Sequence, residues 1–489
     1  MGNLEKSTPE KQGMASAAIS AFLDEANETL HDLHSLILLR HGQVVAEGWW
    51  SPFESNDQHI MFSVSKSFTS TAVGLAVAEG KLNVTDPVIA FFPDEVPPVI
   101  SPNLAAMQVR HLLSMATGHA EDTMGKLTAS ATLNWAKTIL AIPVEYEPGT
   151  FFLYNTGATY LLSAIVQKVT GQTLLEYLEP RLFAPLGIEN PSWESSPQGI
   201  NTGGFGLGAK TADVARFGQL YLQKGVWQGQ RILPQEWVEE ATAWHISNGT
   251  DPASDWAQGY GYQFWRCRNG AYRGDGAFGQ FCLVMPEQDA VLAITAGISD
   301  MQAVLNLVWK QLLPAMEAEP LPANPVAEQE LARKLEHLEI APVKDRVTDS
   351  LAGQVSGKRF VMAENAQKIR AVSFDFDQTG CVLTLEDASG TNQVACGNGQ
   401  WRKGITTLTH HLPRKTAASG GWTDPQTYLI NLYFLTPVLT DPPKTMAIHR
   451  LPFGLTLTCR FVEDQVIIDS QANVSFEPLE QPRLQGSLA

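Results

Sequence analysis

Residues 63–80 read SVSKSFTSTAVGLAVAEG, an apolar run with helical spacing that closes at Gly80 and predicts a helix. Ser63 and Lys66 stand three positions apart, which places both side chains on one face of that helix, one turn apart. A serine hydroxyl is a poor nucleophile until a neighbouring group takes its proton, and a lysine at this spacing is such a group. The free N–H groups at the helix start also favour negative charge that develops on a substrate oxygen.

An SxxK quartet by itself is weak evidence, because most such quartets lie on helix surfaces. Ser65 is a second candidate nucleophile, but Phe68, and not a lysine, stands three positions after it. Tyr154 ends the loop EYEPGTFFLY just before a helical pattern, so its phenol can approach the Ser63–Lys66 pair. A phenol beside two cations can have a lowered pKa and act as a base. The alternative for a lone tyrosine is an ordinary half-buried residue.

Two glycine-rich segments bear on the same site. The run RGDGAFGQ (273–280) leads into a strand, and its glycines let the strand edge approach a ligand closely. The N–H of Ala277 would then be a second oxyanion donor beside that of Ser63, although a plain turn before a hairpin is the alternative. The run GGFGLG (203–208) lacks a following Gly-Lys-Ser/Thr, so we expect a flexible rim and not a phosphate loop.

Other patterns describe the surrounding elements. Residues 15–32 have helical spacing, and Ser35–Arg40 with Gln43–Gly48 read as a hairpin. Residues 278–297 read as two strands around a Pro-Glu-Gln-Asp turn.

Taken in order and spacing, these motifs resemble the serine β-lactamase and penicillin-recognising superfamily, in particular class C β-lactamases and the esterases called family VIII carboxylesterases. The resemblance covers about residues 8–315 and includes MFSVSKSFTSTAVGLAVAEGKL, YNTGATYLLSAIVQKVTG and DGAFGQFCLVMP. It implies an α/β (α+β) sandwich, in which a largely antiparallel sheet has flanking helices and a helical region, with the site between them.

The resemblance also implies roles for particular residues. The nucleophile falls on Ser63, its catalytic partners on Lys66 and Tyr154, and the oxyanion donors on the N–H groups of Ser63 and Ala277. Four more residues are implied at the substrate: Asn155, Thr156, Gly276 and His119.

Two departures from the family pattern bear on the substrate. Thr156 stands where the family has an asparagine, and Gly274-Asp275-Gly276 stands where it has Lys-Thr-Gly, although Arg273 is adjacent. The missing lysine would make a charge-assisted contact with a carboxylate, worth about 1.5–3 kcal/mol. We therefore expect a carboxylesterase for small esters that forms an acyl-enzyme.

Alternatives to the esterase remain open. One is an amidase, a peptidase or a weak β-lactamase acting on D-amino-acid or aminohexanoate-type amides, and another is a non-catalytic binding protein on this fold. In the expected mechanism Tyr154, as a phenolate beside Lys66, takes the Ser63 proton, but the sequence leaves either partner open as the base.

Composition limits the class of protein. The 489 residues exceed the roughly 250–300 that one core holds, so two domains are expected. A net charge of −17 argues against a nucleic-acid partner. The chain shows no secretory pattern, no membrane-spanning run and no CxxC pair among its five cysteines, so we expect a cytoplasmic protein with free thiols. A small-molecule substrate is implied, and a homo-oligomer is left open.

The C-terminal part changes in character. We expect a hydrolase domain over 1–318, a proline-rich linker with a short helix over 319–346, and an all-β domain over 347–489. The last resembles the lipocalin-like β barrels attached to some of these hydrolases. We expect no metal and no cofactor, because the histidine pairs at 31 and 34 and at 410 and 411 are more typical of surface or capping residues.

Overall fold

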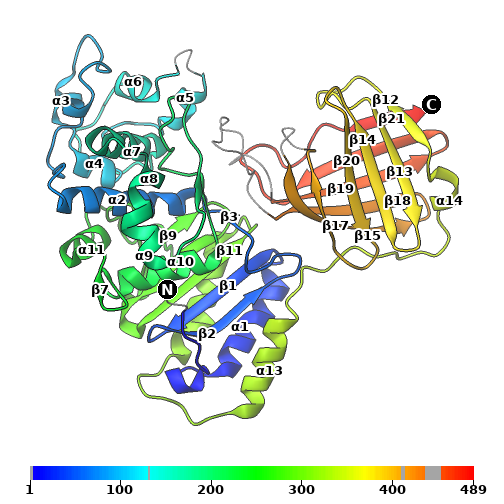
Figure 1. Cartoon of the computed structure of the whole chain (residues 1–489), viewed down its shortest axis with the longest axis horizontal. Helices are drawn as coiled ribbons and strands as arrows, with labels where there is room; N and C mark the ends of the chain where they lie inside the picture. Colours follow the sequence, from blue (N-terminus) through cyan, green and yellow to red (C-terminus); the bar gives the residue numbers. More distant parts are fainter. Residues whose placement is uncertain (1–3, 130–132, 409–412, 436–452) are drawn as a thin grey trace.

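The computed structural model describes residues 4–129, 133–408, 413–435 and 453–489. A six-stranded antiparallel sheet with the order β2-β1-β11-β10-β9-β8 lies at the centre of the first part of the chain (Figure 1). Its strands are β1 (Leu33–Arg40), β2 (Gln43–Trp49), β8 (Trp265–Arg266), β9 (Tyr272–Gly276), β10 (Gln280–Met285) and β11 (Ala290–Ala296). The predicted hairpin and the two strands around the Pro-Glu-Gln-Asp turn are confirmed.

Helices cover both faces of this sheet. All of β1 is buried, because alternate side chains face two different cores, with Ile37 in one and Leu36 in the other. One face carries α2 (Ser65–Ala78) and α10 (Thr211–Leu222), and the other carries α1 (Ser16–Thr29), α12 (Met301–Leu307) and α13 (Pro325–Glu336). The predicted α/β sandwich is therefore confirmed.

A helical region lies beyond the sheet on the α2 side (Figure 1). It contains α3 (Pro102–Ala106), α4 (Val109–Leu113), α5 (Met124–Ala129), α6 (Trp135–Leu140), α7 (Thr156–Thr170), α8 (Leu174–Leu178), α9 (Ala184–Leu186) and α11 (Gln235–Thr242). Two small sheets join it to the rest: β3 (His59–Ile60) with β5 (Leu207–Ala209) and β4 (Ser192–Trp193), and β6 (Val226–Trp227) with β7 (Gln230–Arg231).

The helix predicted to begin at Ser63 begins two residues later. Ser63 lies in a 3-10 turn, Phe62–Val64, that leads into α2. The chain is still held by the small sheet just before this turn, because the Met61 N–H donates to the Leu207 carbonyl at 2.8 Å. Ser63 is thus at the entrance to a helix that is buried on nearly all sides.

The C-terminal part is a closed β barrel (Figure 1). Its described strands form one sheet with the order β15-β14-β13-β12-β21-β20-β19-β18-β17-β16, and a parallel pairing of β15 with β17 closes nine of them into a ring. The bounds are β12 (Arg359–Met362), β13 (Ala371–Asp377), β14 (Gly380–Glu386), β15 (Thr391–Gly397), β16 (Arg402–Thr406), β17 (Arg414–Asp424), β18 (Thr427–Phe434), β19 (Gly454–Val462), β20 (Gln465–Ala472) and β21 (Leu484–Leu488). The predicted all-β domain is confirmed, and its relation to lipocalins stays a prediction.

The helix in the predicted linker packs on the first part of the chain. Leu331 of α13 and Leu338 just after it belong to the core that α1 covers, and Lys334 pairs with Asp24 of α1 at 2.5 Å. The domain boundaries at 318 and 347 stay a prediction.

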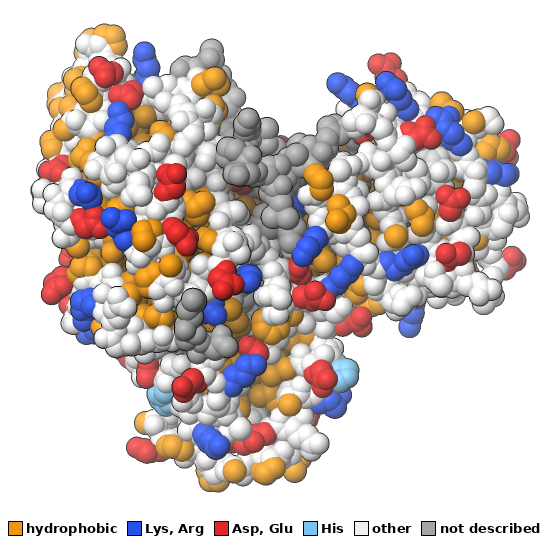
Figure 2. Space-filling model, viewed as in Figure 1, with side chains coloured by type: hydrophobic (Ala, Val, Ile, Leu, Met, Phe, Trp, Pro, Cys, Tyr) orange, Lys and Arg blue, Asp and Glu red, His pale blue; other side chains and the backbone are white. Residues whose placement is uncertain are grey.

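Figure 2 shows acidic and basic side chains interspersed over the described part of the face in view.

Candidate active site

Ser63 and Lys66 are in direct contact. Lys66 Nζ donates to Ser63 Oγ at 2.9 Å and to the Gly204 carbonyl at 2.7 Å, and the lysine side chain is 1% exposed. Burial lowers the pKa of Lys66 to about 7, although the negative charges of Asp122 and Asp275 oppose this shift. A substantial fraction of Lys66 is therefore an uncharged amine near neutral pH, and such an amine can take a proton from the hydroxyl beside it.

Tyr154 stands over the same lysine. Lys66 Nζ lies 4.8 Å from the centroid of the Tyr154 ring, and the Trp265 ring stacks on Tyr154 with the ring centres 5.1 Å apart. Burial raises the pKa of Tyr154 well above its usual value, and the charge of Asp275 adds to this, while a hydrogen bond with Ser63 acts in the other direction. The expected lowering of the Tyr154 pKa is not met, so at neutral pH the phenol keeps its proton and is a hydrogen-bond donor.

The end of β9 runs directly beside the turn that carries Ser63. A Cβ on Gly276 would collide with the Met61 carbonyl, and one on Gly274 would lie 2.6 Å from Ser67 Oγ, so only glycine permits this approach. Ala277, which follows β9, packs against the cluster that contains Phe62. Ala277 therefore packs on the cluster that contains the residue directly before Ser63, and the oxyanion hole formed by the two N–H groups stays a prediction.

Thr156 and Asn155 have different surroundings. Thr156 Oγ1 lies 3.4 Å from Lys66 Nζ, which places its side chain beside the Ser63–Lys66 pair. The side-chain oxygen of Asn155, Oδ1, instead accepts hydrogen bonds from Thr123 and from the Gly157 N–H, which caps α7, and the side chain is fully buried. Asn155 thus shapes the loop beside the site, and its expected contact with the substrate stays a prediction.

His119 lies behind this loop. Its Nδ1 is 2.9 Å from Thr117 Oγ1 and 3.5 Å from Asn155 Nδ2, and its side chain is buried. Burial lowers the pKa of His119 to about 4, against the opposing charge of Glu145, so the ring is neutral at physiological pH. A neutral, enclosed ring fits a role in shaping the pocket wall.

The GGFGLG run is not the flexible rim that its composition suggested. A Cβ on Gly203 would lie 2.9 Å from Ser163 Cβ, and one on Gly204 would lie 2.8 Å from Thr156 Cγ2, so the segment is tightly packed. Its Gly204 carbonyl accepts the hydrogen bond from Lys66. Every residue has a backbone carbonyl, so the residue type does not reveal which carbonyl accepts from Lys66. The glycines of this run were the sequence signal that could have pointed to the contact.

Arg273 does not replace the missing family lysine. The guanidinium is fully buried, pairs with Asp275 at 2.8 Å, donates to the Asp255 carbonyl at 2.8 Å and lies 4.3 Å from the centre of the Trp256 ring. In β9, Arg273 alternates with Gly274, which faces Ser67, so the arginine points to the opposite face of the sheet. It is unavailable to a substrate carboxylate.

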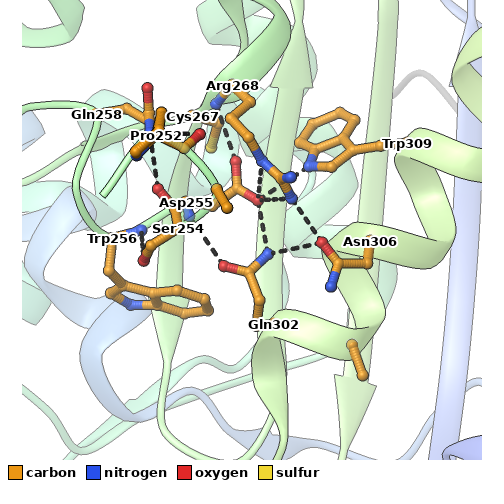
Figure 3. A network of polar contacts seen from close by, with 12 residues as sticks. Pro252, Ser254, Asp255, Trp256, Gln258, Cys267, Arg268, Gln302, Asn306 and Trp309 are labelled. Carbon is orange, nitrogen blue, oxygen red and sulfur yellow. Dashed lines mark hydrogen bonds and ion pairs between the residues drawn. The ribbon is translucent and has the colours of Figure 1, made fainter. Parts of the chain in front are cut away.

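Asp255 holds the loop that carries Trp256 (Figure 3). Its buried carboxylate accepts hydrogen bonds from Arg268, from Gln302 at 2.7 Å and from Trp309 at 2.9 Å. Burial acts to raise the pKa of this carboxyl, but the hydrogen bonds from Arg268, Trp309 and Gln302 outweigh it and keep the pKa below its usual value. One charged group therefore ties the loop to α12 and the residues that follow it.

Asp255→Ala is expected to lower the free energy of unfolding by about 1–3 kcal/mol, because it leaves the half-buried donors of Arg268, Gln302 and Trp309 without their acceptor. Urea denaturation followed by tryptophan fluorescence measures the loss. Asp251→Ala, at an exposed position on the same loop, is the control and should change little. Equal stability of the two variants would contradict this role for Asp255.

The remaining expectations concern metals and membranes. Within the described ranges, no cluster of three His, Cys, Asp or Glu side chains is arranged to hold a metal ion. His34 is buried against His59 and Asp32, His31 is exposed at a turn, and the pair at 410 and 411 lies outside the described residues. The five cysteines are all buried and unpaired. None of the helices in the described part is both long and apolar enough to cross a membrane.

Comparisons with known proteins show the family of the chain. The β-lactamase family model matches residues 6–303. The 6-aminohexanoate-dimer hydrolase of Paenarthrobacter ureafaciens is 27% identical over 309 residues, which cover 59% of this chain and 79% of that protein. Penicillin-binding protein 4 of Amycolatopsis lactamdurans is 26% identical over 61% of this chain and 84% of its own. The lovastatin esterase of Penicillium rubens is 24% identical over 30% of this chain and 42% of its own.

Solved structures share the fold. A penicillin-binding protein homologue from Caulobacter crescentus has a TM-score of 0.50 at 15% identity and covers 64% of this chain and 100% of its own. The octameric penicillin-binding protein homologue from Pyrococcus abyssi has a TM-score of 0.50 at 16% identity, over 96% of this chain and 99% of its own, so the match includes the barrel. The chain belongs to the β-lactamase family and is a hydrolase of the serine β-lactamase and penicillin-binding-protein type.

Proposed function

We propose that this protein is a carboxylesterase that cleaves small, neutral esters through an acyl-enzyme on Ser63. The observation that carries the proposal is the 2.9 Å hydrogen bond between Ser63 and a buried Lys66 whose pKa is lowered to about 7. An amine with that pKa, in contact with a hydroxyl at a helix entrance, has the arrangement of a general base beside its nucleophile.

The proposed reaction has two steps. Neutral Lys66 takes the Ser63 hydroxyl proton while Oγ attacks the ester carbonyl, and the N–H groups of Ser63 and Ala277 stabilise the oxyanion. The C–O bond to the alcohol then breaks, the Tyr154 phenol gives its proton to the departing oxygen, and the Lys66 ammonium restores the phenol. In the second step neutral Lys66 takes a proton from the water that attacks the acyl-enzyme. The bond between the acyl carbon and Ser63 Oγ then breaks, the Lys66 ammonium returns the proton to Ser63 Oγ, and the acid product leaves.

The surroundings of the site support neutral substrates over carboxylates. Gly274-Asp275-Gly276 supplies no cation, and Arg273 is buried and neutralised on the far face of the sheet. Asp122 and Asp275 act on the charge of Lys66, and Asp275 is itself paired with Arg273. Among the residues named here, a substrate carboxylate would therefore find no cation besides Lys66, which the reaction requires as a neutral amine.

Two matched substrates test this proposal: a p-nitrophenyl ester with a neutral acyl chain and its counterpart that ends in a carboxylate. We expect kcat/KM for the neutral ester to be higher by about tenfold to a hundredfold, the equivalent of one missing charge-assisted contact. A fluorophosphonate probe followed by peptide mapping should label Ser63. Preference for the carboxylate ester would contradict the neutral-substrate proposal, and labelling elsewhere would contradict the nucleophile.

Amide hydrolysis is the second candidate, because the relative from Paenarthrobacter ureafaciens is named a 6-aminohexanoate-dimer hydrolase. The p-nitroanilide of the same acyl group separates the two candidates: turnover that rivals the ester would favour the amidase.

We also propose a cytoplasmic location for this small-molecule enzyme, and a homo-oligomer remains part of the proposal because the Pyrococcus abyssi homologue is octameric. Light scattering coupled to size exclusion measures its mass in solution.

A further inference from the structure

Two aromatic residues with a left-handed backbone conformation are the sequence neighbours of the two proposed oxyanion donors. Phe62, directly before Ser63, has φ 44°, and Phe278, directly after Ala277, has φ 67°. Bulky side chains rarely adopt this conformation, and it persists only where surrounding contacts hold it. The two rings meet edge to face, with centroids 5.5 Å apart. The Ser63 N–H belongs to the peptide unit that begins at Phe62, and Phe278 fixes the chain directly after Ala277. The placement of both donors therefore depends on backbone that is held from outside.

The β barrel supplies those outside contacts. Phe453, just before β19, lies 5.8 Å from Phe62, ring centre to ring centre. Phe476, which follows β20, lies 5.8 Å from Phe62 and 4.8 Å from Phe278. Phe476 is 59% exposed, yet its ring contacts are with both of the left-handed residues. It is therefore placed to act on the two turns without belonging to either core.

Polar contacts hold the barrel in this position. Asp32, at the start of β1, accepts hydrogen bonds from the Tyr433 hydroxyl at 2.8 Å and from Asn473 Nδ2 at 2.5 Å. Phe453 also packs on His59, at 4.3 Å between ring centres. Phe278 is also tied to the sheet. The Ile298 N–H, two residues beyond β11, donates to the Phe278 carbonyl at 3.0 Å. Figure 1 shows the barrel beside the catalytic part of the chain.

We propose that Phe453 and Phe476 of the barrel are positioning residues for the oxyanion hole: they hold Phe62 and Phe278 so that the Ser63 and Ala277 N–H groups converge on one oxygen. This inference rests on the proposed function, because it takes Ser63 as the nucleophile. The barrel then takes part in catalysis without touching the substrate. Its aromatic residues act through backbone direction, and an oxyanion donor is effective only when it is aimed at the developing charge.

Phe476→Ala is the main test, because an exposed side chain can be removed without opening a core. We expect kcat to fall by about tenfold, a fraction of the loss that removal of a whole oxyanion donor causes, with KM unchanged. The factor should be the same for acetyl and octanoyl p-nitrophenyl esters, since no substrate contact is lost. Phe476→Tyr keeps the ring contacts and should restore the rate. Phe453→Leu should reduce kcat in the same way.

The control is Leu479→Ala, at a 37% exposed position three residues further along the same segment, which should keep the wild-type kcat. Melting temperatures confirm that all variants are folded. Fluorophosphonate labelling separates the two hypotheses: wild type that fails to label Ser63 contradicts the proposed function. Wild type that labels Ser63 no faster than Phe476→Ala and Phe453→Leu overturns the positioning role. A loss confined to the octanoyl ester also overturns it, because Phe476 would then contact the acyl chain.

Discussion

Ser63→Ala is expected to lower kcat for a short-chain p-nitrophenyl ester by a factor of about 10⁴ or more. The variant keeps the Lys66 amine and the oxyanion donors, but it has no oxygen that can form the acyl-enzyme. Initial rates measure the loss, and intact-mass spectrometry after a fluorophosphonate probe should show the adduct in wild type alone.

Ser65→Ala is the matched control for this experiment. Ser65 is fully buried, and its hydroxyl accepts a hydrogen bond from the Leu207 N–H at 3.1 Å, which holds the small sheet against α2. We expect this variant to lose some stability and to keep the adduct and most of its activity. Turnover that survives in Ser63→Ala and disappears in Ser65→Ala would reverse the two assignments.

Lys66→Met is expected to lower kcat/KM by about 10³-fold or more and to remove the acid limb of the pH profile. In wild type, the rate should rise as pH increases through about 7, because only the uncharged amine can accept the Ser63 proton. The variant should be slow at every pH. Lys81→Met, an exposed lysine three residues after the end of α2, is the control and should keep the wild-type profile. An acid limb that remains near 7 in Lys66→Met would show that another group is the base.

The same variant has a predicted effect on stability. The pKa of Lys66 is about 7 in the folded chain and near 10.5 when unfolded, so the unfolded state binds more protons between these values. The cost of burying the ammonium is therefore present in full below pH 7 and decreases as pH rises toward 10.5. We expect Lys66→Met to raise the melting temperature relative to wild type at pH 6, and to raise it less at pH 9.

Much of the architecture could be predicted from residue pattern. Alternation and turn residues identified the hairpin at 35–48, the strands around the Pro-Glu-Gln-Asp turn and the all-β character of residues 347–489. The strands at 391–397, 402–406, 414–424 and 484–488 are less clear in the sequence. They contain glycines and polar residues, such as Gly420 and Gly421 in β17, and they are strands because neighbours in the ring pair with them.

The candidate site divides in the same way. A spacing of three residues was enough to bring Ser63 and Lys66 together, because helical geometry is local. The pKa shift of Tyr154 could not be predicted from local spacing. Tyr154 was expected to lie beside cations, which would lower its pKa, but burial and the charge of Asp275 raise it. The backbone carbonyl that accepts the hydrogen bond from Lys66 belongs to Gly204, which lies 138 residues away along the chain.

The amino-acid sequence alone therefore determined the contact between Ser63 and Lys66, the order of the main elements and the all-β character of the C-terminal part, since each depends on short-range pattern. The pKa shifts of Lys66 and Tyr154, the direction in which Arg273 points and the contacts of the barrel were decided only by tertiary packing. Each of these depends on how far a charge lies from water and from other charges, and on which distant segments meet, and neither quantity is present in the local sequence.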